Sequence, residues 1–131
     1  MRLDKLAITA QEAFQNAMSV AGDAESAIIQ PIHLLKALLD SDENNLSAII
    51  KRIGADPVWL AQNVTDEIAK MPKQSGSAPM PIPSQDLIKV IDGSVKIAEK
   101  LGDSFATSEH LLIALSEDKT AAGRILTTAG V

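Results

Sequence analysis

The chain has 131 residues, of which 46% are hydrophobic and 2% aromatic, and its 12 basic and 17 acidic residues give a net charge of -5. A chain of this length fits one compact domain, and an aliphatic core with so few aromatics is typical of packed helices. Zero cysteines exclude disulfides, thiolate metal sites and a cysteine nucleophile. No Lys/Arg run is present to neutralise phosphates, so no nucleic-acid partner is expected.

The start of the chain carries charges at Arg2, Asp4 and Lys5 and has no continuous apolar stretch. This pattern predicts neither a signal peptide nor a membrane span, and no membrane association is expected. A cytoplasmic location is the expectation that follows.

Four helices are predicted in the first part of the chain. Apolar residues at three- and four-residue spacing predict a helix from about Asp4 to Ala21. Pro31 suits the first turn of a second helix, "IHLLKALLDS", and a third helix is expected to end at Gly54. Asp56, followed by proline, is a suitable cap for the fourth.

Prolines, serines and glycine then interrupt the pattern in "PKQSGSAPMPIP", which predicts an exposed, protease-sensitive linker. Beyond it, Ser84 and Thr107 are positioned as caps of two further helices, and a last helix is expected to end at Gly130. The domain organisation predicted is a first repeat at 1–70, a linker at 71–83 and a second repeat at 84–131.

The two parts repeat each other, as "QPIHLLKALLDSDENN" and "TSEHLLIALSEDKTA" show. His33 aligns with His110 at an offset of 77 (110 − 33), and the same offset pairs Phe14 with Ile91. We therefore predict an all-α fold with two pseudo-twofold-related four-helix repeats packed as one compact domain. The second repeat lacks its last helix, so the chain is expected to be cut from a longer protein, and the isolated domain is expected to be a monomer.

No phosphate-binding loop, nucleophile elbow or H-E-x-x-H zinc helix occurs. His33 and His110 are the only acid–base candidates, but each lies in the first turn of a predicted helix, where the ring can hydrogen-bond locally and the dipole disfavours a positive charge. Glu109 and His110 are neighbours that point to different sides of a helix, which argues against a metal site. The segment is therefore expected to be neither an enzyme nor a cofactor-binding domain.

The predicted helix from Ser84 to Leu101 has more apolar surface than a core stripe needs. The core stripe consists of Leu87, Ile91, Val95 and Ala98. A neighbouring stripe consists of Val90, Ile97 and Leu101, with a gap at Gly93. Two readings stay open: the extra stripe lines a shallow apolar groove that binds a partner, or it packs against the other repeat or beneath the linker.

The chain resembles, over its whole length, the amino-terminal domain of Clp-family AAA+ ATPases. The resemblance rests on "MRLDKL", the twin "HLL" helices, "PSQDL", "EKLGDSFATSEHLL" and "ILTTAG". The start and "PSQDL" are most similar to the ClpB-type disaggregase. The resemblance implies a double-repeat helical domain tethered to two ATPase modules, which use ATP and magnesium, in a hexameric ring. Such a domain engages unfolded or aggregated polypeptide and works with the DnaK chaperone system.

The resemblance also implies a substrate groove around the second repeat, at Gly93, Ile97 and His110, with Asp103 and Glu109 nearby. Relatives of the ClpC type read phosphorylated arginine through a glutamate before the histidine of both repeats. Glu109 matches this pattern but the first repeat has Ile32, which argues against phosphoarginine binding. The predicted substrate-binding residues are Val90, Gly93, Ile97, Leu101, Asp103, Glu109 and His110.

Two other functions are alternatives to polypeptide binding. One is a docking domain for a specific adaptor protein, as in ClpA- and ClpC-type unfoldases. The other is an independent enzyme, against which the lack of a nucleophile–base pair argues.

Overall fold

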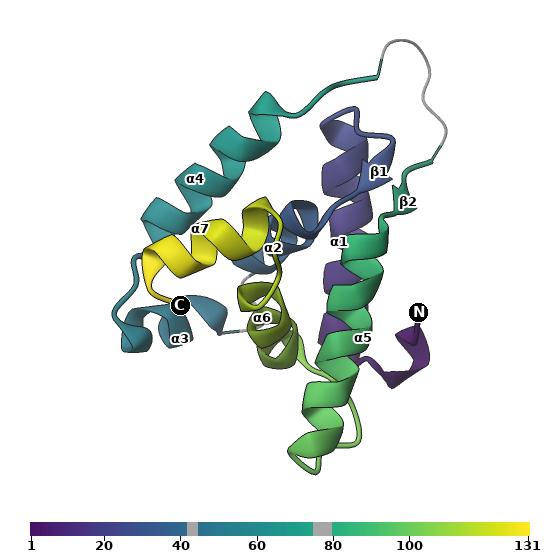
Figure 1. The fold of residues 1–131 in the computed structure, drawn as a ribbon, viewed down its shortest axis with the longest axis vertical. Coiled ribbons are helices and arrows are strands. Elements are labelled where there is room, and N and C mark those ends of the chain that lie inside the picture. Colours follow the sequence, from purple (N-terminus) through teal and green to yellow (C-terminus); the bar gives the residue numbers. More distant parts are fainter. Residues whose placement is uncertain (42–44, 75–79) are drawn as a thin grey trace.

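The computed structural model describes residues 1–41, 45–74 and 80–131, and nearly all of their regular secondary structure is helical (Figure 1). The all-α fold predicted from the sequence is confirmed, with four α-helices before residue 75 and three after residue 79 among the described residues. In chain order the elements are η1 (Leu3–Lys5), α1 (Ile8–Asp23), β1 (Ile28–Ile29), α2 (Pro31–Asp40), α3 (Leu46–Ile53), α4 (Pro57–Lys70), β2 (Ile82–Pro83), α5 (Gln85–Lys100), α6 (Ser108–Ser116) and α7 (Ala121–Ala129).

Several helices begin and end at the predicted capping residues. The side chain of Asp56 accepts a hydrogen bond from the Val58 N–H over 2.9 Å, and that of Ser84 accepts one from the Leu87 N–H over 3.0 Å. Both bonds satisfy a backbone donor that has no partner inside the helix. Gly54 follows α3 with a left-handed φ of 98°, which glycine adopts without steric cost.

The first helix begins later than predicted, at Ile8 instead of about Asp4. The reason is an extended residue, Ala7, whose N–H donates to the Ala106 carbonyl over 2.7 Å. This bond to a distant part of the chain prevents the helix from continuing back to Asp4, and Leu3–Lys5 form a separate 3-10 helix.

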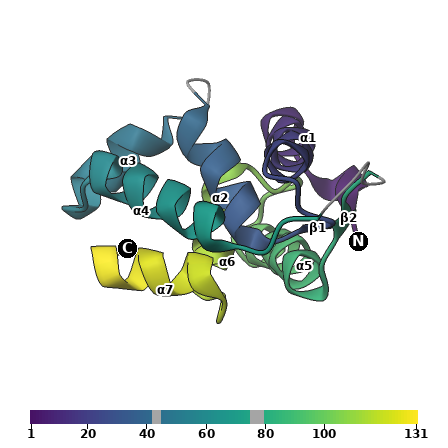
Figure 2. The same cartoon turned by 90° about the horizontal axis from the view of Figure 1, so that it is seen from above.

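The internal repeat is visible in the element boundaries. Helix α5 begins and ends 77 residues after α1, and α6 begins 77 residues after α2. Figure 2 shows α2 and α6 near the centre, α1 and α5 at one end, and α4 beside α7 at the other. Helix α4 has no counterpart after α7 within the described chain, so the second repeat has three helices where the first has four.

The two repeats are joined by the same short parallel pairing, formed twice. In one copy Ile29 of β1 pairs with Pro83 of β2, and in the other Leu6 pairs with Ala106. Shifting Leu6 by 77 gives 83, and shifting Ile29 by 77 gives 106, so the pairings are related by the repeat. The segment before the first helix of each repeat is thus hydrogen-bonded to the segment before the second helix of the other repeat, which ties the repeats into one unit.

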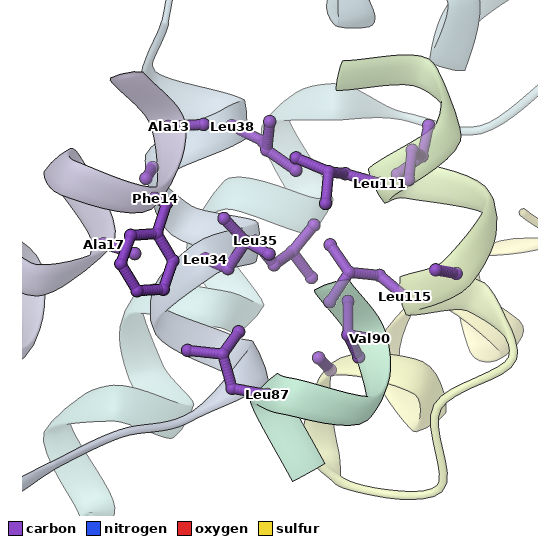
Figure 3. Close-up of a cluster of buried hydrophobic side chains, with 14 of the residues drawn as sticks. Ala13, Phe14, Ala17, Leu34, Leu35, Leu38, Leu87, Val90, Leu111 and Leu115 are labelled. Carbon is purple, nitrogen blue, oxygen red and sulfur yellow. The ribbon is translucent and has the colours of Figure 1, made fainter. Parts of the chain in front are cut away.

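The core lies where the helices of both repeats meet (Figure 3). It combines leucines of α2 and α6 with Phe14 of α1 and Leu87 of α5. The side chains of Leu34, Leu35, Leu111 and Leu115 are fully buried there. Because leucines of both repeats belong to one buried cluster, packing the repeats together contributes to the hydrophobic free energy of the domain.

The predicted linker at 71–83 lies partly outside the described residues, at 75–79. Its described ends are hydrogen-bonded to the first repeat. The Gln74 N–H donates to the Glu25 carbonyl over 2.9 Å, and the Ile82 N–H donates to the Ala27 carbonyl over 3.1 Å. The last residues of the segment are therefore part of the fold, as strand β2, although their composition predicts only an irregular linker.

Candidate functional site

The two histidines perform the same local task in the two repeats. Nδ1 of His33 accepts a hydrogen bond from the Gln30 backbone N–H over 2.8 Å, and Nδ1 of His110 accepts one from the Thr107 N–H over 2.9 Å. In each case the side chain of Gln30 or Thr107 accepts a bond from the histidine backbone, which completes a capping box. The local hydrogen bonding predicted for these rings is confirmed.

The other nitrogen of each ring has a different environment. Since Nδ1 acts as acceptor, the proton of the neutral ring is on Nε2. His110 donates this proton to the Asp103 carboxylate over 3.0 Å. The position equivalent to Asp103 in the first repeat is Ser26, whose hydroxyl donates to the Ile28 carbonyl instead. Nε2 of His33 is buried and has no partner among the described residues.

Burial therefore lowers the pKa of His33 to about 4 from its usual 6.5, because a charged ring would be removed from water. Its side chain is fully buried. This ring lies in the interior and is not placed to exchange protons with a substrate. The structural role predicted for His33 fits this environment.

One hollow of about 510 Å³ lies along α5 and the end of α6, and we call it the α5–α6 groove. Its floor is made of small and apolar residues and its rim of charged ones. The floor consists of Val90, Gly93, Ile97 and Ala114. The rim consists of Asp86, Lys89, Lys96, Lys100, Glu117, Asp118 and Lys119.

A second hollow, of about 650 Å³, lies around the connection between α5 and α6, and we call it the connection hollow. It is lined by Thr9, Asn45, Leu101, Asp103, Ser104, Phe105, Thr107, Ser108, Glu109, His110 and Ile113. Three of these are apolar side chains open to solvent: Leu101 is 64% exposed, Phe105 51% and Ile113 41%. The hydrogen bond between Asp103 and His110 holds the connection against α6.

The structure thus distributes the seven predicted site residues over two neighbouring hollows. Val90, Gly93 and Ile97 line the α5–α6 groove, and the other four line the connection hollow. Ile97 and Leu101 are four residues apart at the end of α5 and lie on one side of it, so the hollows adjoin there.

The residues of the predicted apolar stripe differ in burial. Val90 is only 4% exposed and belongs to the core, so it forms the closed floor of the groove. Ile97 is half-buried and packs against the core, whereas Leu101 is open to solvent. The stripe thus runs from a buried residue in the floor of the α5–α6 groove, Val90, to an exposed residue of the connection hollow, Leu101.

Phe105 and Ile113 were not predicted as site residues. Phe105 stands in a connection with no periodicity, where the sequence does not indicate which side chains face water. Ile113 lies in "HLLIALS", a continuous apolar run in which spacing alone does not separate the exposed position from the buried ones. The rarity of aromatic residues in this chain is the signal that could have drawn attention to Phe105.

Among the described residues there is no group of three or more His, Cys, Asp or Glu side chains that could hold a metal ion. No helix in the described ranges is long and apolar enough to cross a membrane.

The chain matches one protein family over almost its whole length. Residues 5–129 match the Clp repeat N-terminal domain. A curated relative, the chaperone protein ClpB of Rhodopseudomonas palustris, is 37% identical over 133 aligned positions, which cover 100% of this chain and 15% of that protein. The chain therefore spans about 15% of the length of this relative.

Solved structures show the same fold. The N-terminal domain of Hsp104 from Candida albicans superposes with a TM-score of 0.85 at 24% identity, covering 97% of this chain and 83% of that one. A complex of the ClpV N-domain with a VipB peptide superposes with a TM-score of 0.74 at 16% identity, covering 97% of this chain and 80% of that one.

Proposed function

Because the chain belongs to the Clp repeat N-terminal domain family, we propose that it is the substrate-binding amino-terminal domain of an ATP-dependent disaggregase or unfoldase. It engages unfolded or aggregated polypeptide through the apolar surface of its second repeat. It then aids delivery of the polypeptide to the ATPase ring.

The proposal includes the parent protein, of which this chain is a small part. The parent is a cytoplasmic, hexameric AAA+ ATPase that uses ATP and magnesium and works with the DnaK chaperone system. Relatives that are 30–37% identical to this chain are named chaperone protein ClpB, which supports a chaperone role for the parent.

The observation that carries the proposal is the group of exposed apolar side chains in the connection hollow. Leu101 and Phe105 of the connection after α5 and Ile113 of α6 line one hollow. Exposed apolar side chains gathered in this way usually mark a binding surface. Each square ångström of apolar surface that a client covers contributes about 25 cal/mol to the free energy of binding. Three side chains offer only a small contact, so we expect an affinity of about micromolar or weaker once the association entropy is subtracted. Weak binding suits a domain that must release its client.

A second candidate function is docking of a specific adaptor protein. The complex of the ClpV N-domain with a VipB peptide favours keeping it, because there a domain of the same fold holds a peptide of a named partner. An adaptor would bind as a folded protein of one kind, whereas a disaggregase domain would bind many unrelated unfolded chains.

The test is an amide-shift titration of the chain with an unfolded client, comparing wild type with Leu101→Asp, Phe105→Asp and Ile113→Asp. All three residues are exposed, so the charge is tolerated in the free domain. Val58→Asp is the matched control, since Val58 is an apolar residue that is 73% exposed on α4 and lines neither hollow.

We expect the three variants to weaken client binding at least about tenfold, whereas Val58→Asp binds like wild type. Undiminished binding by all three variants, with circular dichroism showing that they are folded, would contradict the proposed surface. Binding of one folded protein and of no unfolded client would favour adaptor docking.

A further inference from the structure

The α5–α6 groove has a twofold-related copy elsewhere on the molecule. A hollow of about 480 Å³ lies between α1 and α2, and we call it the α1–α2 groove. Each of its ten lining residues, shifted by 77 positions, gives a residue that lines the α5–α6 groove. Equivalent positions of the two repeats therefore line the two grooves, which can be compared residue by residue.

The two copies carry opposite charge. Lys89 and Lys100 of the α5–α6 groove stand where the α1–α2 groove has Glu12 and Asp23. Four lysines and three carboxylates line the α5–α6 groove, a formal charge of +1. Among the described residues three carboxylates and no lysine or arginine line the α1–α2 groove, a formal charge of -3, and one of them, Asp40, is paired with Lys36. The lysines are thus gathered on one groove of a chain whose net charge is -5.

The lysines of the α5–α6 groove are free to meet a ligand. The ammonium groups of Lys89, Lys96, Lys100 and Lys119 make no ion pair with a described residue. Positions 89, 96 and 100 follow spacings of seven and four, so they lie along one side of α5. Of the carboxylates on the same rim, Asp118 already accepts hydrogen bonds from the backbone N–H and hydroxyl of Thr120.

The floors of the two grooves also differ. Gly93 and Ile97 in the α5–α6 groove correspond to Asn16 and Val20 in the α1–α2 groove. The α5–α6 floor is thus entirely small or apolar, while its copy has a polar amide at the centre. An apolar floor beneath a lysine rim is complementary to a chain segment that has both apolar and acidic side chains.

We propose that the α5–α6 groove selects client segments in which an acidic side chain lies within one or two residues of a large apolar one, and that the α1–α2 groove does not bind them. This inference rests on the proposed function, because it specifies the chemistry of the polypeptide that the domain engages. The apolar residue covers Ile97 and Gly93, and the carboxylate pairs with Lys96 or Lys100.

The probes are two synthetic unfolded peptides with the same leucine and phenylalanine residues, one with glutamates and the other with lysines between them. Amide-shift titrations of the 131-residue chain measure both affinities. We expect the acidic peptide to bind about tenfold more tightly at low ionic strength, with shifts along α5, and the difference to shrink as salt screens the exposed charges.

A charge-reversal series locates the preference. Lys89→Glu, Lys96→Glu and Lys100→Glu, combined, should remove or invert the preference for the acidic peptide. The matched control combines Lys51→Glu, Lys70→Glu and Lys73→Glu, which change the net charge equally and lie outside both grooves. The control should keep the preference, because the effect comes from the rim and not from total charge.

The outcomes separate this inference from the function on which it rests. Equal binding of both peptides, lost in Leu101→Asp, overturns the acidic preference and leaves the proposed function standing. Binding of neither peptide overturns both. The inference is also overturned if polyglutamate binds as tightly as the acidic peptide, or if the control triple variant loses the preference. Either result would mean that the domain attracts anions in general.

Discussion

The backbone N–H of Gln30 donates to Nδ1 of His33 over 2.8 Å and thereby fixes the imidazole proton on the buried Nε2. The equivalent ring, His110, has a carboxylate to receive its Nε2 proton, and His33 has none among the described residues. The ring in the first repeat is therefore neutral in the folded state at pH values above its lowered pKa of about 4, and its protonation is coupled to unfolding.

The free energy of unfolding should fall as the pH drops below 6.5. Because burial lowers the pKa of His33 to about 4, the unfolded chain binds a proton on this ring between pH 6.5 and 4 and the folded chain does not. Well above pH 6.5 the ring is neutral in both states, and the group has no effect on stability. By pH 5 the loss from this group is about 2 kcal/mol, measured by denaturant unfolding at a series of pH values.

His33→Gln is the control for that series, since glutamine retains an acceptor for the Gln30 N–H and does not titrate. Its free energy of unfolding should change less than that of wild type between pH 7 and 5. If wild type and His33→Gln lose equal stability over this range, the buried ring is not the cause.

Gly123→Ala should destabilise the domain. A Cβ at position 123 would lie 1.7 Å from the Asp118 carbonyl oxygen, which belongs to the backbone and cannot move away like a flexible side chain. The turn between α6 and α7 would have to shift, at a cost of about 1–3 kcal/mol. Thermal unfolding followed by circular dichroism measures this, and a melting temperature equal to that of wild type would contradict the close approach.

Gly93→Ala should have the opposite effect on stability. A Cβ at Gly93 would lie 3.9 Å from the Ala114 Cβ, an ordinary contact, and alanine favours a helix interior over glycine by about 0.5–1 kcal/mol. The melting temperature should rise by about 2–4 °C. A fall in melting temperature would mean that the floor of the α5–α6 groove is tighter than the structure has it.

Much of the fold could be predicted because the same helical pattern occurs in both repeats of the sequence. Caps such as Asp56 and Ser84 act within a few residues, so the sequence indicates them directly. What could not be predicted depends on contacts between distant segments. Ala7 is extended because it pairs with Ala106, and Ile82 forms a strand because it pairs with β1. No local pattern contains these pairings.

In the candidate site, too, the local sequence predicts some features and contacts between helices decide others. The helical period located the stripe of Val90, Ile97 and Leu101, but a period gives the direction of a side chain and not the depth at which a neighbouring helix covers it. Helix α6 passes close to Gly93, at Ala114, and Val90, one turn before, is buried. Leu101, beyond the end of α5, remains exposed.

The depth difference along this stripe predicts a graded response to charge. Ile91→Asp should unfold the domain, because Ile91 is fully buried and an unpaired carboxylate there has no partner and no water. Ile97→Asp should leave the domain folded but less stable than wild type, since Ile97 is half-buried against the core. Leu101→Asp should unfold at nearly the same denaturant concentration as wild type, because its side chain is exposed. Circular dichroism and denaturant unfolding of the three variants measure the gradient.

Two outcomes at Ile97 would contradict the gradient. If Ile97→Asp unfolds the domain as completely as Ile91→Asp, Ile97 belongs to the core, and only the connection hollow remains as the apolar surface that a client could cover. If Ile97→Asp is as stable as Leu101→Asp, the floor of the α5–α6 groove is more open to water than its packing indicates.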